Sequence, residues 1–145
     1  MQKAVADLVL VRSCAHHTMN EKTLLTAASL VAIVLFTIHQ ADDVVRGMVP
    51  GGFLNLVIIA MGSIWLYATL MLVGRRSGYI IILIFSLLML VIPVVHMMGR
   101  GMGFGTTRGN GLLFVWTVLA IGVTSLCSVA LSIRGLLSLR PRTLK

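Results

Sequence analysis

Four long runs of apolar residues, joined by short connections, limit the possible folds of this chain more than any other feature. The runs span residues 23–41, 53–73, 79–98 and 112–133. A helix needs about 20 mostly apolar residues to cross the roughly 30 Å of hydrocarbon in a bilayer. The connections between the runs are too short to hold a separate soluble domain. We therefore expect an all-α, polytopic membrane protein, folded as a bundle of four transmembrane helices.

The composition supports this interpretation and excludes another. Apolar residues make up 58% of the chain and charged residues 11%, whereas soluble domains are about 45–50% apolar and about 25% charged. The formal net charge of +8 would also suit a protein that binds nucleic acid. However, so little polar surface remains that a basic groove for nucleic acid is excluded.

The basic residues predict how the chain is oriented in the membrane. With a cytoplasmic N-terminus, the cytoplasmic side holds nine of them: Lys3, Arg12, Lys22, Arg75, Arg76, Arg134, Arg140, Arg142 and Lys145. The outer side then holds three: Arg46, Arg100 and Arg108. Because Lys and Arg concentrate on the cytoplasmic side of membrane proteins, both termini are expected to be cytoplasmic.

This orientation divides the chain into three parts. Residues 1–22 form a cytoplasmic N-terminal tail, 23–133 a single transmembrane domain, and 134–145 a basic cytoplasmic C-terminal tail. Within the first tail, residues 1–18 resemble a structured element less than the rest of the chain does. We expect the basic side to contact anionic lipid, and the location to be the bacterial inner (cytoplasmic) membrane.

One polar segment stands out at the end of the first apolar run. His39, Asp42, Asp43 and Arg46 are spaced three and four apart, so a helix would place them on one stripe. Ionisable groups at the rim of the hydrocarbon are costly, and they usually face the bundle interior or a wet cavity. This stripe is therefore the first candidate for a functional site.

The third apolar run ends with a matching pair at the same expected depth. His96 and Arg100 are four residues apart there, one helical turn on the same face. If the two helices are neighbours, His39, Asp43 and His96 converge. Arg46 and Arg100 would then balance the carboxylates, including that of Asp42.

Three interpretations of this polar cluster stay open. It is a structural latch of hydrogen bonds and ion pairs, a metal site, or a site for a small molecule or a proton. As a metal site, His39, Asp43 and His96 suit Zn, Cu or Fe, and the thioethers of Met97 and Met98 would favour Cu. A haem held by two histidines is a poorer fit.

Other residues predict how the helices pack. Small side chains four residues apart in the last run form one face for close helix contact: Ala120, Thr124, Ser128 and Ser132. Among the aromatic residues, Trp116 and Tyr79 are expected at the membrane interfaces, and Trp65 and Tyr67 in helix packing.

The pattern H-x-x-D-D-x-x-R-G, at residues 39–47 and within a chain of four spans, resembles that of a group of small, uncharacterised bacterial membrane proteins. The resemblance covers roughly residues 20–135 and implies the four-span architecture. It implies no activity, because none is assigned to that group.

The expected function is therefore argued from the polar cluster alone. We expect an outward-facing His/Asp/Arg pocket that binds a metal ion or small ligand without catalysis, since the sequence holds no H-E-x-x-H or G-x-S-x-G motif. One alternative is an accessory or structural subunit of a larger membrane complex. Another is a small dimeric transporter or channel, although the scarcity of mid-span ionisable residues disfavours charged substrates.

Overall fold

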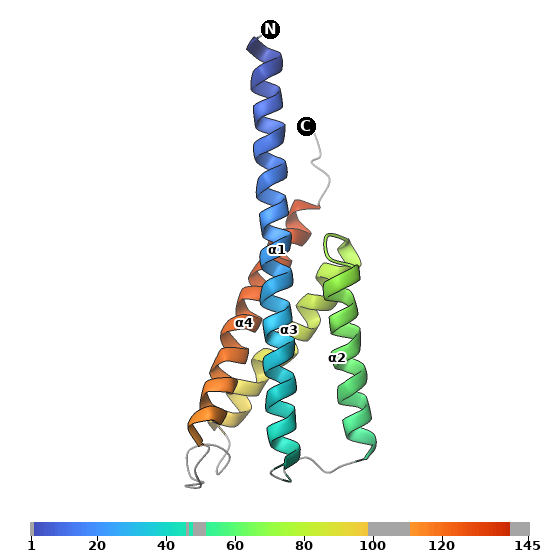
Figure 1. Ribbon diagram of the computed structural model, residues 1–145, viewed down its shortest axis with the longest axis vertical. Helices are drawn as coiled ribbons and strands as arrows, with labels where there is room; N and C mark the ends of the chain where they lie inside the picture. The colour runs from blue at the N-terminus through green and yellow to red at the C-terminus, as the bar shows by residue number, and fades with distance from the viewer. Residues whose placement is uncertain (1, 46, 48–51, 99–110, 140–145) are drawn as a thin grey trace.

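The structure is a computed structural model that describes residues 2–45, 47, 52–98 and 111–139. For residues 2–19, 96–98, 111 and 113 it describes the course of the backbone alone. The regular structure of these parts is helical (Figure 1), and the helices are α1 (Gln2–Val45), α2 (Phe53–Met71), α3 (Arg76–Met98) and α4 (Gly111–Ser138). The sequence-based expectation of an all-α fold is thus confirmed.

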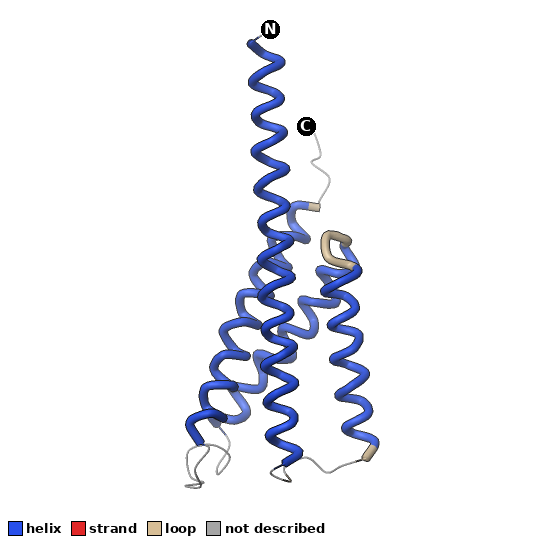
Figure 2. The backbone as a smooth tube through the Cα atoms, in the orientation of Figure 1, coloured by secondary structure: helices blue, strands red, loops and turns tan. Residues whose placement is uncertain are grey.

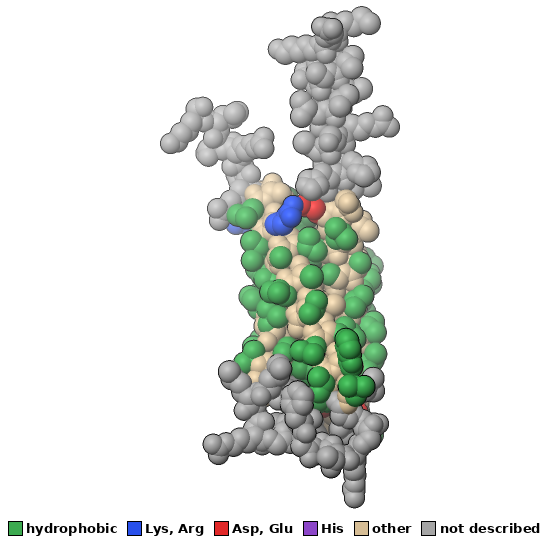
Figure 3. Space-filling model, turned by 90° about the vertical axis from the view of Figure 1, so that its left-hand side faces the viewer, with side chains coloured by type: hydrophobic (Ala, Val, Ile, Leu, Met, Phe, Trp, Pro, Cys, Tyr) green, Lys and Arg blue, Asp and Glu red, His purple; other side chains and the backbone are tan. Residues whose placement is uncertain are grey.

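Each of these helices contains a segment long and apolar enough to cross a bilayer. Within the described residues the segments are Asn20–Val45, Phe53–Met71, Arg76–Val95 and Phe114–Ser138. On the face drawn in Figure 3, apolar side chains cover the flank of the bundle, and charged side chains gather at one end. By the length and apolar composition of these helices, the chain is a helical, multi-pass membrane protein.

The N-terminal segment differs from the tail that the sequence led us to expect. Helix α1 begins at Gln2 and projects beyond the other helices before it joins them (Figure 1). The physical reason is that the chain contains no glycine or proline from Gln2 to Val45, so nothing interrupts the helix. It ends before Gly47, whose φ of 69° is a left-handed conformation.

Helices α1, α3 and α4 pack through faces whose buried positions alternate between steps of three and four residues. We call these faces together the packed seam. Its α4 row is Phe114, Val118, Ile121, Ser125, Ser128, Ser132 and Gly135. Its α3 row is Tyr79, Ile82, Ser86 and Met89, and its α1 row is Leu25, Ser29, Ala32, Phe36 and His39. A repeat of 3.5 residues keeps one face of each helix directed at its neighbours.

The predicted small-residue face of α4 is confirmed in part. Ser128 and Ser132 are fully buried, and so is Ser125 beside them. Ala120 and Thr124 are only partly buried. The seam follows a 3.5-residue repeat, so a row of strict four-residue steps drifts off it along the helix.

Close approach between α3 and α4 depends on glycine. A Cβ atom added at Gly135 would lie 2.2 Å from Cε1 of Tyr79, and one added at Gly122 would lie 3.0 Å from Cγ of Pro93. These two contacts also show that α3 and α4 run antiparallel. Tyr79, which was expected at a membrane interface, is 5% exposed and its ring covers Gly135; its depth in the bilayer stays a prediction.

The other aromatic residues differ in burial. Trp65 is buried, and its ring stacks on Phe85 with centroids 5.9 Å apart. Trp116 is exposed in the second turn of α4, as a residue at the membrane interface would be. Tyr67 was expected in packing but is also exposed.

Helix α2 packs through its second half, where its buried residues Trp65, Ala68 and Thr69 lie. Oγ1 of Thr69 donates a hydrogen bond to the carbonyl of Trp65 and lies 2.7 Å from Oγ of Ser29 on α1. The Ser29 hydroxyl is therefore the donor in that contact. Toward Phe53, α2 lies well apart from α1 (Figures 1 and 2).

Candidate functional site

The predicted polar stripe on α1 is directed partly at α4. Nε2 of His39 lies 3.6 Å from Oδ2 of Asp43, one turn further along the helix. The His39 side chain is 2% exposed and that of Asp43 is 15% exposed. The His39 ring lies against Phe114 of α4, with centroids 5.3 Å apart at an interplanar angle of 44°. His39 thus combines an ion-pair geometry along α1 with an aromatic contact to α4.

The remaining members of the predicted cluster are described less fully. Asp42 is partly buried in the last turns of α1. Arg46 and Arg100 lie outside the described residues. The others are on the final turn of α3, where their side chains are not described: His96, Met97 and Met98. The convergence of His39, Asp43 and His96 therefore stays a prediction.

The same holds for the predicted metal site. Among the residues whose side chains the structure describes, no group of three or more His, Cys, Asp or Glu is placed to hold a metal ion. His39 and Asp43 supply two donors, and a structural zinc site commonly needs four. A zinc or copper site here would depend on His96 and on further ligands beyond the described side chains.

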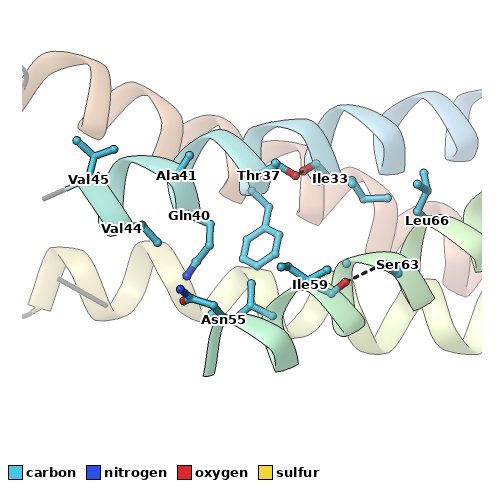
Figure 4. A pocket seen from close by; sticks show the side chains of 13 residues that line it. Ile33, Thr37, Gln40, Ala41, Val44, Val45, Asn55, Ile59, Ser63 and Leu66 are labelled. Carbon is cyan, nitrogen blue, oxygen red and sulfur yellow. Dashed lines mark hydrogen bonds between the residues drawn. The ribbon is translucent and has the colours of Figure 1, made fainter. Parts of the chain in front are cut away.

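A cavity of about 550 Å³ lies on a different face of α1, between α1 and α2 (Figure 4). From α1 it is lined by Ile33, Phe36, Thr37, Gln40, Ala41, Val44 and Val45. From α2 it is lined by Asn55, Ile58, Ile59, Gly62, Ser63 and Leu66. The volume falls in the range of about 300–1,000 Å³ that is typical of small-molecule sites, which are also mostly apolar with a few polar groups.

The cavity exists because α1 and α2 separate from the point where Ser29 meets Thr69. Its α2 wall includes two small residues, Gly62 and Ser63. A Cβ atom added at Gly62 would have no neighbouring atom within 4 Å. A larger side chain at this position would therefore extend into open space instead of into the protein.

The polar side chains of the cavity fall into two groups. The hydroxyls of Thr37 and Ser63 each donate to a carbonyl of their own helix, those of Ile33 and Ile59, at 2.8 Å. Such hydroxyls are already satisfied and offer little to a ligand.

The second group consists of two amides. Gln40 and Asn55 point toward one another across the cavity (Figure 4). Oδ1 of Asn55 is buried and has no hydrogen-bond partner among the described residues. A buried acceptor left unpaired costs free energy of about 1–3 kcal/mol, so a ligand that donates a hydrogen bond to this oxygen would remove that cost.

Sequence reasoning missed this cavity. The polar residues Thr37, Gln40, Asn55 and Ser63 and the glycine at 62 interrupt two otherwise apolar faces. These interruptions are the only sequence signal of the cavity, and two of them are hydroxyls that a helix satisfies internally. The spread between α1 and α2 cannot be read from residue spacing.

The opposite end of the bundle is basic. Lys22, Arg75, Arg76 and Arg134 lie there, and Arg134 pairs with Glu21 of α1. The Lys22 side chain lies against the turn at Gly74, with Nζ 3.1 Å from the place that a Cβ atom would occupy. A cation here suits the carbonyl end of α2, where the helix dipole is negative.

Comparison with known protein families, with curated proteins and with solved structures finds no match. The function is therefore argued from the described side chains.

Proposed function

We propose that the protein binds a small ligand in the cavity between α1 and α2 and performs no chemistry on it. The observation that carries this proposal is the cavity of about 550 Å³, which is mostly apolar and contains Oδ1 of Asn55, an oxygen with no hydrogen-bond partner among the described residues. The ligand would lie on a different face of α1 from His39 and Asp43. The binding role expected from the sequence is kept, but the site proposed for it is this cavity instead of the cluster of His39, Asp43 and His96.

A binding role is favoured over a catalytic one by the chemistry of the lining. None of the described lining residues is Asp, Glu, His, Cys, Lys or Arg. General acid–base and nucleophilic catalysis rely mainly on these side chains, with activated Ser, Thr and Tyr hydroxyls as further options. The hydroxyls that are present, on Thr37 and Ser63, are bonded to helix carbonyls.

We also propose an orientation. The basic end, with Lys22, Arg75, Arg76 and Arg134, would face the cytoplasm and anionic lipid, in a bacterial inner membrane. The cavity would then open in the outer half of the bilayer. A green fluorescent protein fused to the C-terminus should fluoresce, because it matures in the cytoplasm. A fusion that is produced in normal amounts but does not fluoresce would show that the orientation is the opposite of the proposed one.

Native mass spectrometry of the purified protein tests the binding proposal. The wild type should carry a bound mass of a small molecule, and Gly62→Phe should lose it because the ring fills the cavity. Gly62→Ala is the matched control, with the same loss of glycine but little added volume, and should retain the bound mass. If the wild type carries nothing, or if Gly62→Phe binds as well as Gly62→Ala, the proposal is wrong.

A metal ion is the second candidate ligand, favoured by the 3.6 Å separation of Nε2 of His39 from Oδ2 of Asp43. Elemental analysis of the purified protein tests it directly. One equivalent of Zn or Cu in the wild type, lost in Asp43→Asn, would support this site. Metal at trace level in the wild type, or equal metal in both proteins, would exclude it.

A further inference from the structure

We propose that the ligand of this cavity is a neutral, single-chain amphiphile that enters sideways from the bilayer and donates a hydrogen bond to Oδ1 of Asn55. The inference rests on the proposed binding function and specifies the chemistry of the ligand. Three properties of the cavity support it: the position of its two amides, the buried acceptor on Asn55 and the character of its walls.

The polar groups of the cavity that are free to bind a ligand lie toward one end of the two helices, because the deeper hydroxyls of Thr37 and Ser63 are bonded to helix carbonyls. Gln40 lies close to the end of the α1 membrane segment at Val45, and Asn55 close to the start of α2 at Phe53. At a rise of about 1.5 Å per residue, both amides lie within about 10 Å of the segment ends. Ile33 and Leu66 line the cavity further toward the middle of the membrane. A lipid-like molecule has the same arrangement, with its head near the surface and its chain inside.

Oδ1 of Asn55 determines which polar group the ligand needs. Oδ1 of Asn55 is buried and has no partner among the described residues, so a ligand with an O–H or N–H group removes a desolvation cost. The head is neutral because the described lining contains no charged side chain to balance an ion. A hydroxyl or a primary amide meets both conditions.

The walls favour a flexible chain over a second protein helix. Helices associate in lipid through small residues that let backbones approach, whereas most of this cavity's lining, apart from Ala41, Gly62 and Ser63, consists of larger side chains such as Phe36, Ile58 and Leu66. The described lining comes from α1 and α2, and its outer residues Val44, Val45 and Ile59 are exposed. The cavity is therefore accessible from the hydrocarbon, which is where a lipid chain would approach.

The test uses the whole protein in phosphatidylcholine nanodiscs with three probes of equal chain length: monopalmitoylglycerol, palmitate at alkaline pH and hexadecane. Binding is measured by native mass spectrometry over a range of probe concentrations. We expect monopalmitoylglycerol to bind most tightly. Asn55→Leu should weaken it about tenfold, the value of one buried hydrogen bond.

The matched control is Ser63→Ala, which also removes a polar group from the cavity wall. Because the Ser63 hydroxyl donates to the carbonyl of Ile59, we expect less than a twofold change. An equal loss in Ser63→Ala and Asn55→Leu would overturn the role of Asn55. Gly62→Phe should abolish binding of all three probes.

The outcomes separate this inference from the proposed function. If the three probes bind equally and Asn55→Leu changes nothing, the cavity binds ligands but the amphiphile inference is wrong. If Gly62→Phe binds all three probes as tightly as the wild type does, both the amphiphile inference and the proposed binding function are wrong. If the wild type is a dimer that Gly62→Phe converts to a monomer, the occupant is a second copy of the chain and the inference is overturned.

Discussion

The packed seam and the α1–α2 cavity are adjacent regions that differ in how closely their helices approach. In the seam, fully buried small residues stand between the larger side chains, among them Ser125, Ser128 and Ser132. The cavity is lined mainly by larger side chains such as Val44 and Leu66, and Phe36 belongs to both regions. In water, the larger apolar residues would form the tighter core. In lipid, apolar bulk gives helices no reason to associate, so contact follows the small residues.

Helix α1 belongs to both regions, and Phe36 lies where its two faces meet. Ser29, Ala32 and His39 follow the 3.5-residue repeat of the seam, and Gln40 and Val44 line the cavity. The seam thus fixes α1 firmly while another face of the same helix stays accessible. A binding site on a helix held in this way is more precise than one on a loop.

The same side chain placed in both regions should have opposite effects on stability. In Gly135→Leu the new side chain meets the Tyr79 ring, since its Cβ alone would lie 2.2 Å from Cε1. We expect a loss of about 2–3 kcal/mol in the free energy of unfolding, as for other overpacked interiors. The measurement is reversible unfolding of the purified protein in mixed micelles.

Gly62→Leu is the partner variant, because a Cβ atom at Gly62 has no neighbour within 4 Å. Replacing a helical glycine raises helix propensity, so stability should be unchanged or higher by up to about 1 kcal/mol. Similar destabilisation by the two substitutions would mean that the cavity is as tightly packed as the seam, and the comparison would fail.

A smaller effect is expected at His39, at one end of the seam. His39→Ala removes the ring that lies 5.3 Å from Phe114, and we expect a loss of about 1–2 kcal/mol in the free energy of unfolding. His39→Phe keeps an aromatic ring and should recover most of it. Both variants should retain the mass bound in the cavity.

The opposite result at His39 would favour the sequence-based pocket over the cavity. That result is His39→Ala with wild-type unfolding behaviour but without the bound molecule. Native mass spectrometry and unfolding of the same preparation separate these cases, since a latch affects stability and a ligand site affects binding.

Ser29 and Thr69 lie where the two regions meet, and their hydrogen bond should have a smaller effect still. Ser29→Ala removes the 2.7 Å hydrogen bond that holds α2 to α1, and bonds of this kind in membranes are worth about 0.6 kcal/mol. A double-mutant cycle with Thr69→Val measures the coupling. A coupling energy near zero would mean that this bond contributes nothing, and that other contacts of α2, such as the stacking of Trp65 on Phe85, hold the helix in place.

The transmembrane architecture was predictable because hydropathy and length are local properties of the sequence. The predicted start of α2 at Phe53 and the predicted end of α3 at Met98 agree with the structure. The helix at residues 2–22 was not predicted, because its sequence is not strongly apolar and the expectation rested on hydropathy; the absence of glycine and proline there, which permits a helix, was not used. The buried position of Tyr79 was missed for another reason: it depends on Gly135, 56 residues further on, and on the antiparallel pairing of α3 with α4.

The candidate site was less predictable than the fold. The scarcity of acidic residues directed attention to His39 and Asp43, which lie 3.6 Å apart one turn along α1, but whether they form a site stays a prediction. It could not reveal the cavity, because the residues that define it are neutral. Asn55 became informative only when its oxygen proved to be buried without a partner among the described residues, which is a property of the packed helices.

The smallest effect is expected at the basic end of the seam, where Arg134 pairs with Glu21. The Arg134 side chain is 60% exposed, so water and salt screen the pair, and Glu21→Gln should cost less than about 0.5 kcal/mol. That cost should vanish at high salt, whereas the cost of Gly135→Leu should not change. Unfolding of both variants at low and high salt tests this. A salt-independent loss in Glu21→Gln would mean that the seam relies on charge at this end as well as on the close contact of small residues.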